Sequence, residues 1–280
     1  MNNESEFINP IGVMQGRLST PVNGMIQAFP RDHWRDEFRI AGEIGLDALE
    51  FIFDGPDSPL LDPTGAQEIR DLADDNGIVV SSISTDYTMF CPLFGNTKSS
   101  TLKWMHSLID SCAGIGIPRV GISFEDNSAI LTEEHGNQAI DSMQELTKHA
   151  EQTEIILTVE ALLFDGNLRC FFERVGSPNL RVNFDTGNSC AYGEHPAEVI
   201  RDLRDLIGGV HIKDRPRLFG MTKPLGTGDT DLKGSIEALQ DIGYGGPLIL
   251  QAARNGEDDV ATVKGYMELV RSMFKVKAAG

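Results

Sequence analysis

Short apolar runs alternate with amphipathic segments along the whole chain, and this alternation predicts the fold. Eight runs rich in β-branched and aliphatic residues predict strands at 11–15, 47–53, 78–84, 119–124, 154–162, 180–185, 208–213 and 247–251. Many of these runs are apolar throughout rather than at every second position. That pattern is typical of strands covered on both faces, as in a parallel sheet.

The segments between these strands carry apolar residues at helical spacing. In the first segment, Trp34 and Phe38 share one face. In the second, Asp62 is expected to cap the helix, with Pro63 in the first turn and Gly77 after the last. Helices are predicted over 31–45, 62–77, 97–116, 132–152, 168–176, 195–208, 231–243 and 258–276.

Eight strand–helix units in about 250 residues predict an α/β fold of the (β/α)8 TIM barrel type. A doubly wound sheet is the alternative, but it needs fewer units and a glycine-rich phosphate-binding motif that the sequence lacks. Because no low-complexity linker interrupts the chain, a single domain is expected over residues 1–280.

Charge narrows the range of partners. The net charge is 24 − 42 = −18, which repels a phosphate backbone and disfavours nucleic acid as a partner. The start MNNESEF has no basic stretch followed by an apolar run, so no signal peptide is expected. No apolar stretch is long enough to span a bilayer, so no membrane association is expected.

The four cysteines are scattered, without a C-x-x-C pair. Structural disulfides and a cysteine zinc site are therefore not expected, and a cytoplasmic location fits best. Small buried hydrophobic side chains are the expected role of these residues, at Cys91, Cys112, Cys170 and Cys190.

Polar residues collect where the predicted strands end, which is the active-site end of a TIM barrel. Glu160, Asp185 and His211 come from three successive strands, each among apolar neighbours. Two carboxylates and an imidazole form a site suited to Mn²⁺, Mg²⁺, Co²⁺ or Zn²⁺. Gln251, at the end of the eighth strand, could add a neutral oxygen ligand.

Each of these residues also has an ordinary explanation. Glu160 could form a salt bridge, Asp185 could cap the next segment, and His211 could be a core histidine with satisfied hydrogen bonds. A buried carboxylate is costly unless it is paired or bound to a metal. Three such residues on adjacent strands favour a metal site.

Further polar positions point towards a ligand. Gln15 ends the first strand, and Glu50 lies inside the second, which suggests a residue of the pocket. Lys213, Arg215 and Arg217 give the loop after the seventh strand a positive charge suited to a sugar phosphate or an acid. A solvated loop that balances local charge is an equal alternative. The glycines of PLGTGD, residues 224–229, predict a plain turn rather than a phosphate-binding loop.

At this point several segments resemble a known family. IGVMQGRLS, QAFP, GLDALEFIFD, VEAL, NFDTGN, VHIKDR and PLGTGDTDL resemble the sugar isomerase/epimerase family of the xylose isomerase-like TIM barrel superfamily. The resemblance covers nearly the whole chain. It implies a divalent cation, most often Mn²⁺, bound by the residues at positions 160, 185, 211 and 251.

The sequence departs from the family pattern at two of these positions. The family carries Glu where this chain has Gln251, and its epimerases often carry His where this chain has Asn188, a position for substrate binding. The family's sugar-binding arginine corresponds to Arg215 or Arg217.

The resemblance also implies a chemistry. In the family one ligand Glu removes a proton from carbon and the opposite Glu returns one on the other face. Glu160 is expected as the first base, whereas the amide of Gln251 cannot exchange protons usefully near neutral pH. Compared with the family's Glu, Gln251 lacks a negative charge beside the cation. The missing attraction between that charge and the cation is roughly 4 kcal/mol at about 4 Å and an effective dielectric constant near 20. Other candidate acids are Asp86, Glu125 and Asp214. For each of them, the alternative role is that of an ordinary solvated carboxylate in a loop.

The predicted function is a metal-dependent isomerase or epimerase that acts on a ketose or ketose phosphate. One alternative is a catalytically altered member that only binds a sugar-like ligand, and another is an inosose dehydratase-like lyase. A DNA repair enzyme resembling endonuclease IV is disfavoured, because the other histidines fall mostly in helical patterns and the charge opposes DNA. A homo-oligomer is compatible with the sequence.

Overall fold

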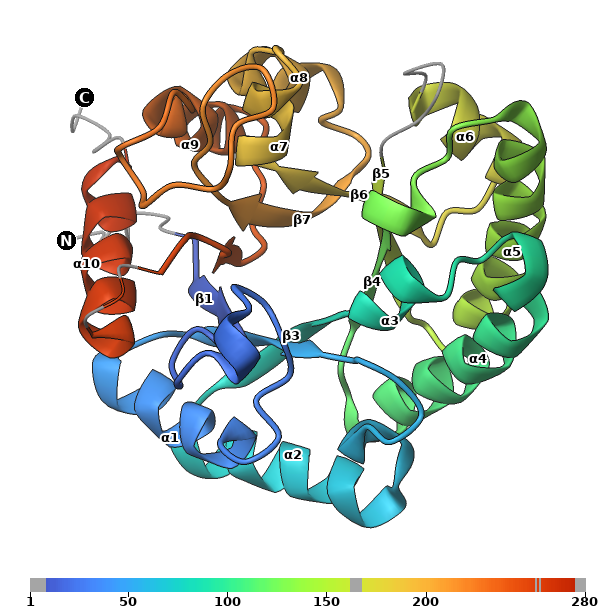
Figure 1. Cartoon of the computed structure of the whole chain (residues 1–280), viewed down its shortest axis with the longest axis horizontal. Helices are drawn as coiled ribbons and strands as arrows, with labels where there is room; N and C mark the ends of the chain where they lie inside the picture. Colours follow the sequence, from blue (N-terminus) through green and yellow to red (C-terminus); the bar gives the residue numbers. More distant parts are fainter. Residues whose placement is uncertain (1–8, 162–167, 255, 257, 275–280) are drawn as a thin grey trace, which may run out of the picture.

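Eight parallel strands close into a barrel in the order of the sequence (Figure 1). The computed structural model describes residues 9–161, 168–254, 256 and 258–274. Pairing of β1 with both β2 and β8 closes the ring, which confirms the predicted (β/α)8 barrel. The strands are β1 Ile11–Met14, β2 Ala48–Ile52, β3 Val79–Ser84, β4 Arg119–Phe124, β5 Ile156–Ala161, β6 Leu180–Asp185, β7 Ile207–Ile212 and β8 Leu248–Leu250.

Helices surround the barrel and cover its outer face (Figure 1). Every predicted helix is present within a few residues of its expected bounds, except at the end of the sixth. The helices that correspond to the eight predictions are α1 Trp34–Ile44, α2 Pro63–Asn76, α4 Lys98–Ile115, α5 Glu133–Gln152, α6 Leu168–Val175, α8 Pro196–Asp202, α9 Leu232–Asp241 and α10 Asp259–Ser272.

The helix expected over 195–208 was predicted too long. Helix α8 ends at Asp202, and β7 already begins at Ile207. The intervening residues form a turn in which Leu206 N donates to Leu203 O over 2.7 Å. The apolar residues at 203 and 206 continue the helical pattern in sequence, but they turn the chain into the next strand.

Two short helices were not predicted, and both follow a strand directly. Helix α3, Asp86–Phe90, follows β3, and α7, Thr186–Ala191, follows β6. Segments of five and six residues are too short to show a helical period. Helix α7 begins because the Asp185 carboxylate accepts a hydrogen bond from Asn188 N over 2.8 Å.

The capping signals of the second helix are confirmed. Asp62 Oδ2 accepts from Gly65 N over 2.9 Å, and Pro63 is the first helical residue. Gly77 ends the helix with φ of 65°, a left-handed conformation that glycine adopts at low cost. These signals fix where the chain leaves the helix and enters β3.

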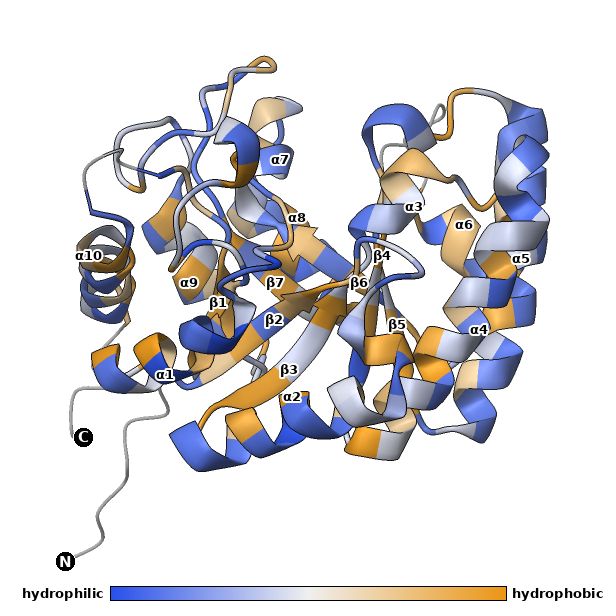
Figure 2. Ribbon diagram, turned by 60° about the horizontal axis from the view of Figure 1, so that its bottom comes forward, coloured by the Kyte–Doolittle hydropathy of each residue, from blue (hydrophilic) through white to orange (hydrophobic). Residues whose placement is uncertain are grey.

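Apolar side chains fill the interior, as the continuous hydrophobic runs predicted. Figure 2 shows apolar colouring concentrated on the strands and on the helix faces turned towards them. Leu49, Ile83, Val120 and Leu157, from four neighbouring strands, are completely buried. Cys112 and Cys190 are buried, as expected of small core side chains, whereas Cys91 and Cys170 are only partly buried, which differs from the prediction. Among the helices that the structure describes, none has both the length and the apolar character needed to cross a bilayer.

Strand register sets the height of the polar residues at the carboxyl ends. Asp185 is paired with His211 across β6 and β7, and Ser123 is paired with Glu160 across β4 and β5. A register shift at Val182 and Asn183 adjusts β6 against β7. The barrel therefore brings the predicted site residues to one end.

Candidate metal centre and substrate cavity

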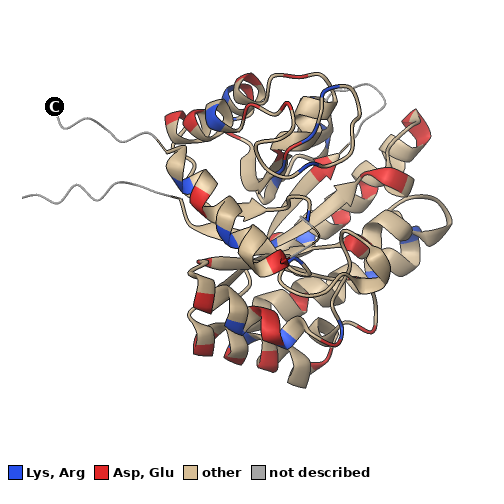
Figure 3. Ribbon diagram, turned by 60° about the vertical axis from the view of Figure 1, so that its left-hand side comes forward, with Lys and Arg blue, Asp and Glu red and all other residues tan. Residues whose placement is uncertain are grey.

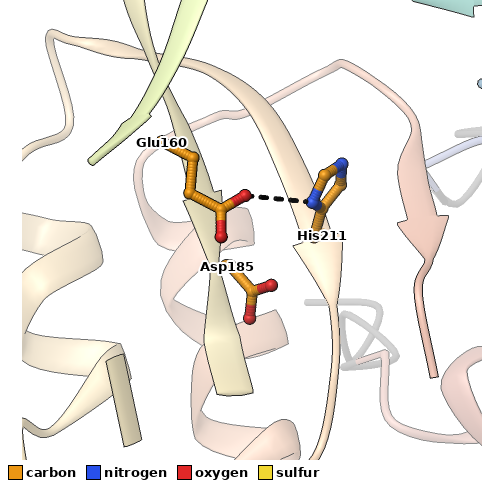
Figure 4. A group of neighbouring side chains, drawn as sticks. All are labelled: Glu160, Asp185 and His211. Atoms are coloured by element: carbon orange, nitrogen blue, oxygen red, sulfur yellow. Dashed lines mark ion pairs between the residues drawn. The ribbon is translucent and has the colours of Figure 1, made fainter. Parts of the chain in front are cut away.

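Three predicted ligands meet at the carboxyl ends of β5, β6 and β7. One ligand atom each from Glu160, Asp185 and His211 lies within 4.8 Å of the other two (Figure 4). Asp185 and His211 are buried, and Glu160 is partly exposed. The structure thus brings together the two carboxylates and the imidazole that the sequence singled out.

The imidazole of His211 is held from both sides. Its Nε2 lies 2.8 Å from Glu50 Oε1, and its Nδ1 lies 3.5 Å from Glu160 Oε2. Glu50 is itself fixed by Ser82, whose hydroxyl donates to Oε2 over 2.7 Å. With Nε2 donating to Glu50, the Nδ1 lone pair is directed towards the carboxylates. A carboxylate behind a ligating histidine typically orients the ring and increases its basicity.

In the absence of a cation, the carboxylates favour a charged imidazole. Burial alone would lower the pKa of His211, but Glu50 and Glu160 outweigh it and raise the pKa to about 10. Since a ligating imidazole must be neutral, binding of a metal there would release a proton.

One carboxylate oxygen of Asp185 accepts a hydrogen bond, whereas the other does not. Its Oδ1 accepts from Asn188 N, which is the cap of α7. Its Oδ2 is buried and lies 2.8 Å from Lys213 Nζ, in an ion pair that does not meet hydrogen-bond geometry. The two alternatives for this residue, a cap and a ligand, are therefore compatible.

Asn188 links Glu160 to a basic residue. Its Nδ2 donates to Glu160 Oε1, and its Oδ1 accepts from Arg215 Nη1 over 2.6 Å. Arg215 is in turn fixed by Gly220, whose carbonyl accepts from Nε over 2.8 Å. This chain of contacts orients the Glu160 carboxylate.

Gln251 presents an unused oxygen. It follows β8, where its backbone N donates to Ile212 O over 3.1 Å. Its Nε2 donates to Gln27 Oε1 over 3.1 Å and contacts Met14 Sδ at 3.4 Å. Its Oε1 is buried and has no hydrogen-bond partner among the described residues.

These residues fit a divalent cation. Buried carbonyl and carboxylate oxygens are costly when they are left without a partner. Gln251 Oε1 is in this condition and lines the same cavity as Glu160 and His211. Asp185 Oδ2 accepts no hydrogen bond among the described residues, although it is paired with Lys213, and it lies beside Glu160 and His211. Oxygen ligands with one imidazole nitrogen suit Mn²⁺, Mg²⁺, Co²⁺ and Zn²⁺. The identity of the metal stays a prediction.

A cavity of about 950 Å³ opens over this centre. Its lining includes most of the predicted site residues: Glu50, Glu160, Asn188, His211, Lys213, Arg215 and Gln251. Gln15, Asp185 and Arg217 lie outside that lining; Asp185 lines a neighbouring cavity together with Glu160 and Asn188. Gln15 is buried and accepts from Ile52 N over 3.0 Å, whereas Arg217 donates to Glu194 O over 2.8 Å. Their expected contact with substrate stays a prediction.

Two further carboxyl groups line the cavity. Asp86 accepts from Ser84 Oγ and from Gln27 Nε2, each over 2.9 Å, and burial raises its pKa to about 6. Glu125 accepts from Tyr192 OH over 2.7 Å, and burial, followed by the charge of Glu160, raises its pKa to about 8.

The partners of these carboxyl groups could not be found from the sequence. Gln27, the partner of Asp86, lies in the loop after β1. Tyr192, the partner of Glu125, follows α7. In each pair the two residues are far apart along the chain. Gln27 belongs to the segment QAFP, residues 27–30, but that resemblance does not indicate its contact with Asp86, and Tyr192 belongs to no motif. A polar residue after a strand end is the only signal, and it does not indicate which partner it meets.

The glycine turn after β7 binds a carboxylate of its own chain. Asp214 Oδ2 accepts from Gly226 N and Gly228 N over 2.8 and 2.9 Å, and Oδ1 accepts from Thr230 N over 3.1 Å. A Cβ at position 228 would lie 2.2 Å from Asp214 Oδ1, which explains glycine there. The turn is therefore closed on Asp214, in agreement with the predicted plain turn.

Comparison with known proteins agrees with the fold and the resemblance. A 2-epi-5-epi-valiolone 7-phosphate 2-epimerase of Actinoplanes sp. is 26% identical over 205 residues, 72% of this chain and 76% of that protein. The L-ribulose-5-phosphate 3-epimerase UlaE of Escherichia coli strain SE11 is 23% identical over 260 residues, 85% of this chain and 89% of that protein.

A solved structure has the same architecture. The apo 3-keto-D-glucoside 4-epimerase YcjR of E. coli superposes with a TM-score of 0.75 at 18% identity, covering 95% of this chain and all of that chain. The named relatives are epimerases, which are isomerase-class enzymes, and this confirms the expected class of enzyme. The sequence model of the family described as xylose isomerase-like TIM barrel matches residues 38–273, so the chain belongs to that family.

Proposed function

We propose that this protein is a divalent-metal-dependent isomerase or epimerase of a small carbohydrate. The observation that carries the proposal is the meeting of Glu160, Asp185 and His211 within 4.8 Å, under a cavity at the carboxyl ends of the strands. The two relatives described above are named as epimerases of a sugar phosphate and of a sugar-like phosphate, which supports the same reaction class.

Glu160, Asp185, His211 and Gln251 would hold the cation. When bound, it would supply a Lewis acid that stabilises negative charge as it develops on substrate oxygens. Buried Asp185 and His211 keep the centre shielded from water, which strengthens electrostatic interactions there. Mn²⁺ is the cation we expect.

Glu160 is the proposed base that removes a proton from a substrate carbon. Its Oε1 is held by Asn188, and its Oε2 faces His211 Nδ1. Glu160 also lines the cavity, so a substrate can reach it. Fixing a base at a defined position contributes to catalysis because no reorganisation is needed when the proton moves.

Asp86 is the proposed second acid, in place of the amide at position 251. Gln27 joins the two, since it donates to Asp86 Oδ1 and accepts from Gln251 Nε2. A carboxyl group whose pKa is near 6 can both give and take a proton at neutral pH. Asp214 is unsuited, because three backbone N–H groups already bind it.

One observation favours a dehydratase-like lyase as a second candidate. The pKa of Glu125 is raised to about 8, so this carboxyl group carries a proton at neutral pH. A protonated acid beside Glu160 is what the departure of a substrate hydroxyl group requires.

The third candidate is a family member that binds a sugar-like ligand without catalysing a reaction. The neutral side chain of Gln251 favours this candidate.

Deuterium uptake separates these candidates. Mn²⁺-loaded protein is incubated in heavy water with a panel of ketoses, ketose phosphates and inososes, and the products are followed by NMR. An epimerase or isomerase incorporates deuterium at a carbon beside the carbonyl and yields a new isomer, and chelation with EDTA abolishes both. We expect Glu160→Gln to lose at least about a hundredfold in rate, as is typical of a removed general base.

The matched control is Glu268→Gln, an exposed position on α10, which should keep the wild-type rate. Loss of water from the substrate would instead establish the lyase. Binding of a panel member without any exchange would establish the inactive member, and either result would overturn the proposal.

A further inference from the structure

One basic residue of the cavity lining is paired with a proposed metal ligand. Lys213 lines the cavity, and its Nζ lies 2.8 Å from Asp185 Oδ2. The other basic residues of the lining, in the part of the chain that the structure describes, have different partners. Arg31 pairs with Asp54, and Arg215 donates to an amide oxygen and to a backbone carbonyl. Lys213 is therefore the residue whose direct partner a bound cation would take.

The backbone and the first methylenes of Lys213 are fixed against the start of α7. Lys213 N donates to Thr186 Oγ1 over 3.0 Å, and the same hydroxyl donates to Lys213 O over 2.8 Å. A Cβ at Gly187 would lie 2.8 Å from Lys213 Cγ, so the lysine stem packs against the glycine backbone. Movement of this side chain is therefore confined to its outer bonds and its ammonium group.

The ammonium group is held by charge rather than by a hydrogen bond. Asp185 Oδ2 accepts no hydrogen bond among the described residues, and its pair with Lys213 does not meet hydrogen-bond geometry. The side chains of Lys213 and Asp185 are 14% and 1% exposed. A buried carboxylate needs a counter-charge. In the absence of a metal, the ammonium group supplies it.

A cation on Asp185 would compete with this ammonium group. Asp185 Oδ1 already accepts from Asn188 N, which leaves Oδ2 for a metal. Two positive groups on the same oxygen repel each other strongly in a buried site. The metal would be held by several ligands, whereas the ammonium is held by one ion pair. We therefore expect the ammonium group to be displaced.

The charge of the protein makes a displaced ammonium useful in the cavity. Acidic residues are abundant over the outer helices (Figure 3), in keeping with the net charge of −18. The cavity lining also has more Asp and Glu than Lys and Arg residues. Such a field attracts a cation and repels an anion. A negatively charged substrate oxygen therefore needs a local positive charge besides the metal.

We infer that Lys213 is an anion-binding residue controlled by the metal. Without a cation it neutralises Asp185. Once a cation binds there, the ammonium group turns into the cavity and binds a negatively charged oxygen of the substrate. The inference rests on the proposed function for the position of the cation.

Two substrate groups have the required chemistry. One is the phosphate of a ketose phosphate. The other is the oxygen on which negative charge develops when a base removes a proton beside a carbonyl group. Inorganic phosphate is a probe for the first group. Oxalate, a planar dianion with two vicinal oxygens, is a probe for the second.

Crystal structures of the Mn²⁺-loaded protein test the displacement, alone and with oxalate or inorganic phosphate. Lys213 Nζ should lie more than about 4 Å from Asp185 Oδ2, beyond the distance of an ion pair. With an anion present, Nζ should lie about 3 Å from one of its oxygens.

Calorimetric titration of the Mn²⁺-loaded protein with the two anions tests the binding role. Lys213→Met should weaken the binding of at least one anion about tenfold or more, because a charge-assisted hydrogen bond is lost. The affected anion identifies which of the two substrate groups Lys213 binds. Lys223→Met is the control, since Lys223 is exposed on the same loop and does not line the cavity. This control should keep the wild-type affinities.

An ammonium group that stays on Asp185 in the Mn²⁺-loaded crystal, or that turns to Glu125 instead of the anion, would overturn the inference. Equal affinities of the wild type and Lys213→Met for both anions would do the same, as would no measurable binding of either anion. Mn²⁺ bound at Asp185 with Lys213 unmoved would refute this inference alone. Mn²⁺ that binds elsewhere or not at all would refute the proposed metal centre, and the inference with it.

Discussion

The amide of Gln251 is the residue that most distinguishes this metal centre. Its Oε1 is buried without a partner among the described residues, whereas its Nε2 is fixed by Gln27. A carbonyl oxygen in this position can bind a cation, but it brings no charge. The centre would therefore hold its cation with two carboxylates, one imidazole and one neutral oxygen.

Replacing Gln251 by Glu should tighten Mn²⁺ binding by at least about tenfold. The Coulomb gain is roughly 4 kcal/mol at about 4 Å and an effective dielectric constant near 20, and desolvation of the new carboxylate offsets part of it. Calorimetric titration with Mn²⁺ measures the change. The control Gln152→Glu adds the same charge at an exposed position on α5. Equal affinities in the wild type and Gln251→Glu would remove this residue from the metal centre.

Asp86→Asn should stabilise the protein at pH 7.5 but not at pH 4. Burial raises the pKa of Asp86 to about 6, so the folded protein binds this proton more tightly than the unfolded chain does. Wild-type stability is consequently lost as the pH rises from about 4 to about 6, by up to about 3 kcal/mol for this group. An asparagine Oδ1 can still accept from Ser84 and Gln27.

Urea unfolding of the wild type and Asp86→Asn at the two pH values provides this test. We expect the two midpoints to diverge only at the higher pH. A difference of the same size at both pH values would mean that ionisation of Asp86 does not cause it.

At the scale of elements, the strands supply Glu160, Asp185 and His211, and the loops after them position further side chains around the cavity. The loop between β7 and α9 is folded around the buried carboxylate of Asp214, which binds three backbone N–H groups. The same loop supplies Arg215 to the cavity. The position of this arginine therefore depends on a carboxylate that takes no part in the proposed reaction.

Asp214→Asn should lower the free energy of unfolding by about 3 kcal/mol, because charge-assisted hydrogen bonds to backbone groups are lost. The amides of Gly226 and Gly228 should also exchange faster with heavy water. Asp229→Asn is a suitable control, since Asp229 is exposed and, among the described residues, its carboxylate accepts one backbone hydrogen bond, from Arg217 N. Asp214→Asn with wild-type exchange at both glycines would show that this carboxylate does not hold the loop.

The strands and long helices were predictable because their signals are local. Apolar runs, an Asp62 cap and a Gly77 stop each lie within a few residues of the feature that they define. Helices α3 and α7 were missed because five or six residues cannot display a period. Prediction from sequence therefore succeeded wherever neighbouring residues determine the conformation.

The site was predictable in part for a related reason. Glu160, Asp185 and His211 end successive strands of a barrel, so the topology alone brings them together. The bridge made by Gln27 spans 59 residues to Asp86 and 224 residues to Gln251, and no motif indicates it. Contacts of this kind depend on the path of whole loops, which a local pattern does not specify.

For the whole molecule, the cation would couple the barrel strands to one another. Its candidate ligands Glu160, Asp185 and His211 lie on β5, β6 and β7, and the proposed fourth ligand follows β8. An ion that binds only the folded protein stabilises it by about 2.7 kcal/mol at a free concentration one hundred times its dissociation constant. Such an ion would also give a partner to Gln251 Oε1, which is buried and has no hydrogen-bond partner among the described residues.

Chelation of the metal should therefore lower the melting temperature by roughly 5–10 °C, given the shift per kcal/mol typical of chains of this size. Differential scanning calorimetry with EDTA, and again after Mn²⁺ is restored, measures the change. The variant Asp185→Asn should show a much smaller difference between the two conditions. An identical melting temperature with and without Mn²⁺ in the wild type would speak against a structural contribution of the ion.

Pulsed electron paramagnetic resonance of the Mn²⁺-loaded protein tests the central claim most directly. We predict that electron spin echo modulation from one imidazole nitrogen appears on the bound Mn²⁺ of the wild type, because His211 Nδ1 faces Glu160 and Asp185. His211→Gln should abolish this nitrogen signal. Tightly bound Mn²⁺ that shows no nitrogen coupling in the wild type, or a coupling that persists in His211→Gln, would contradict a metal centre built from these three side chains.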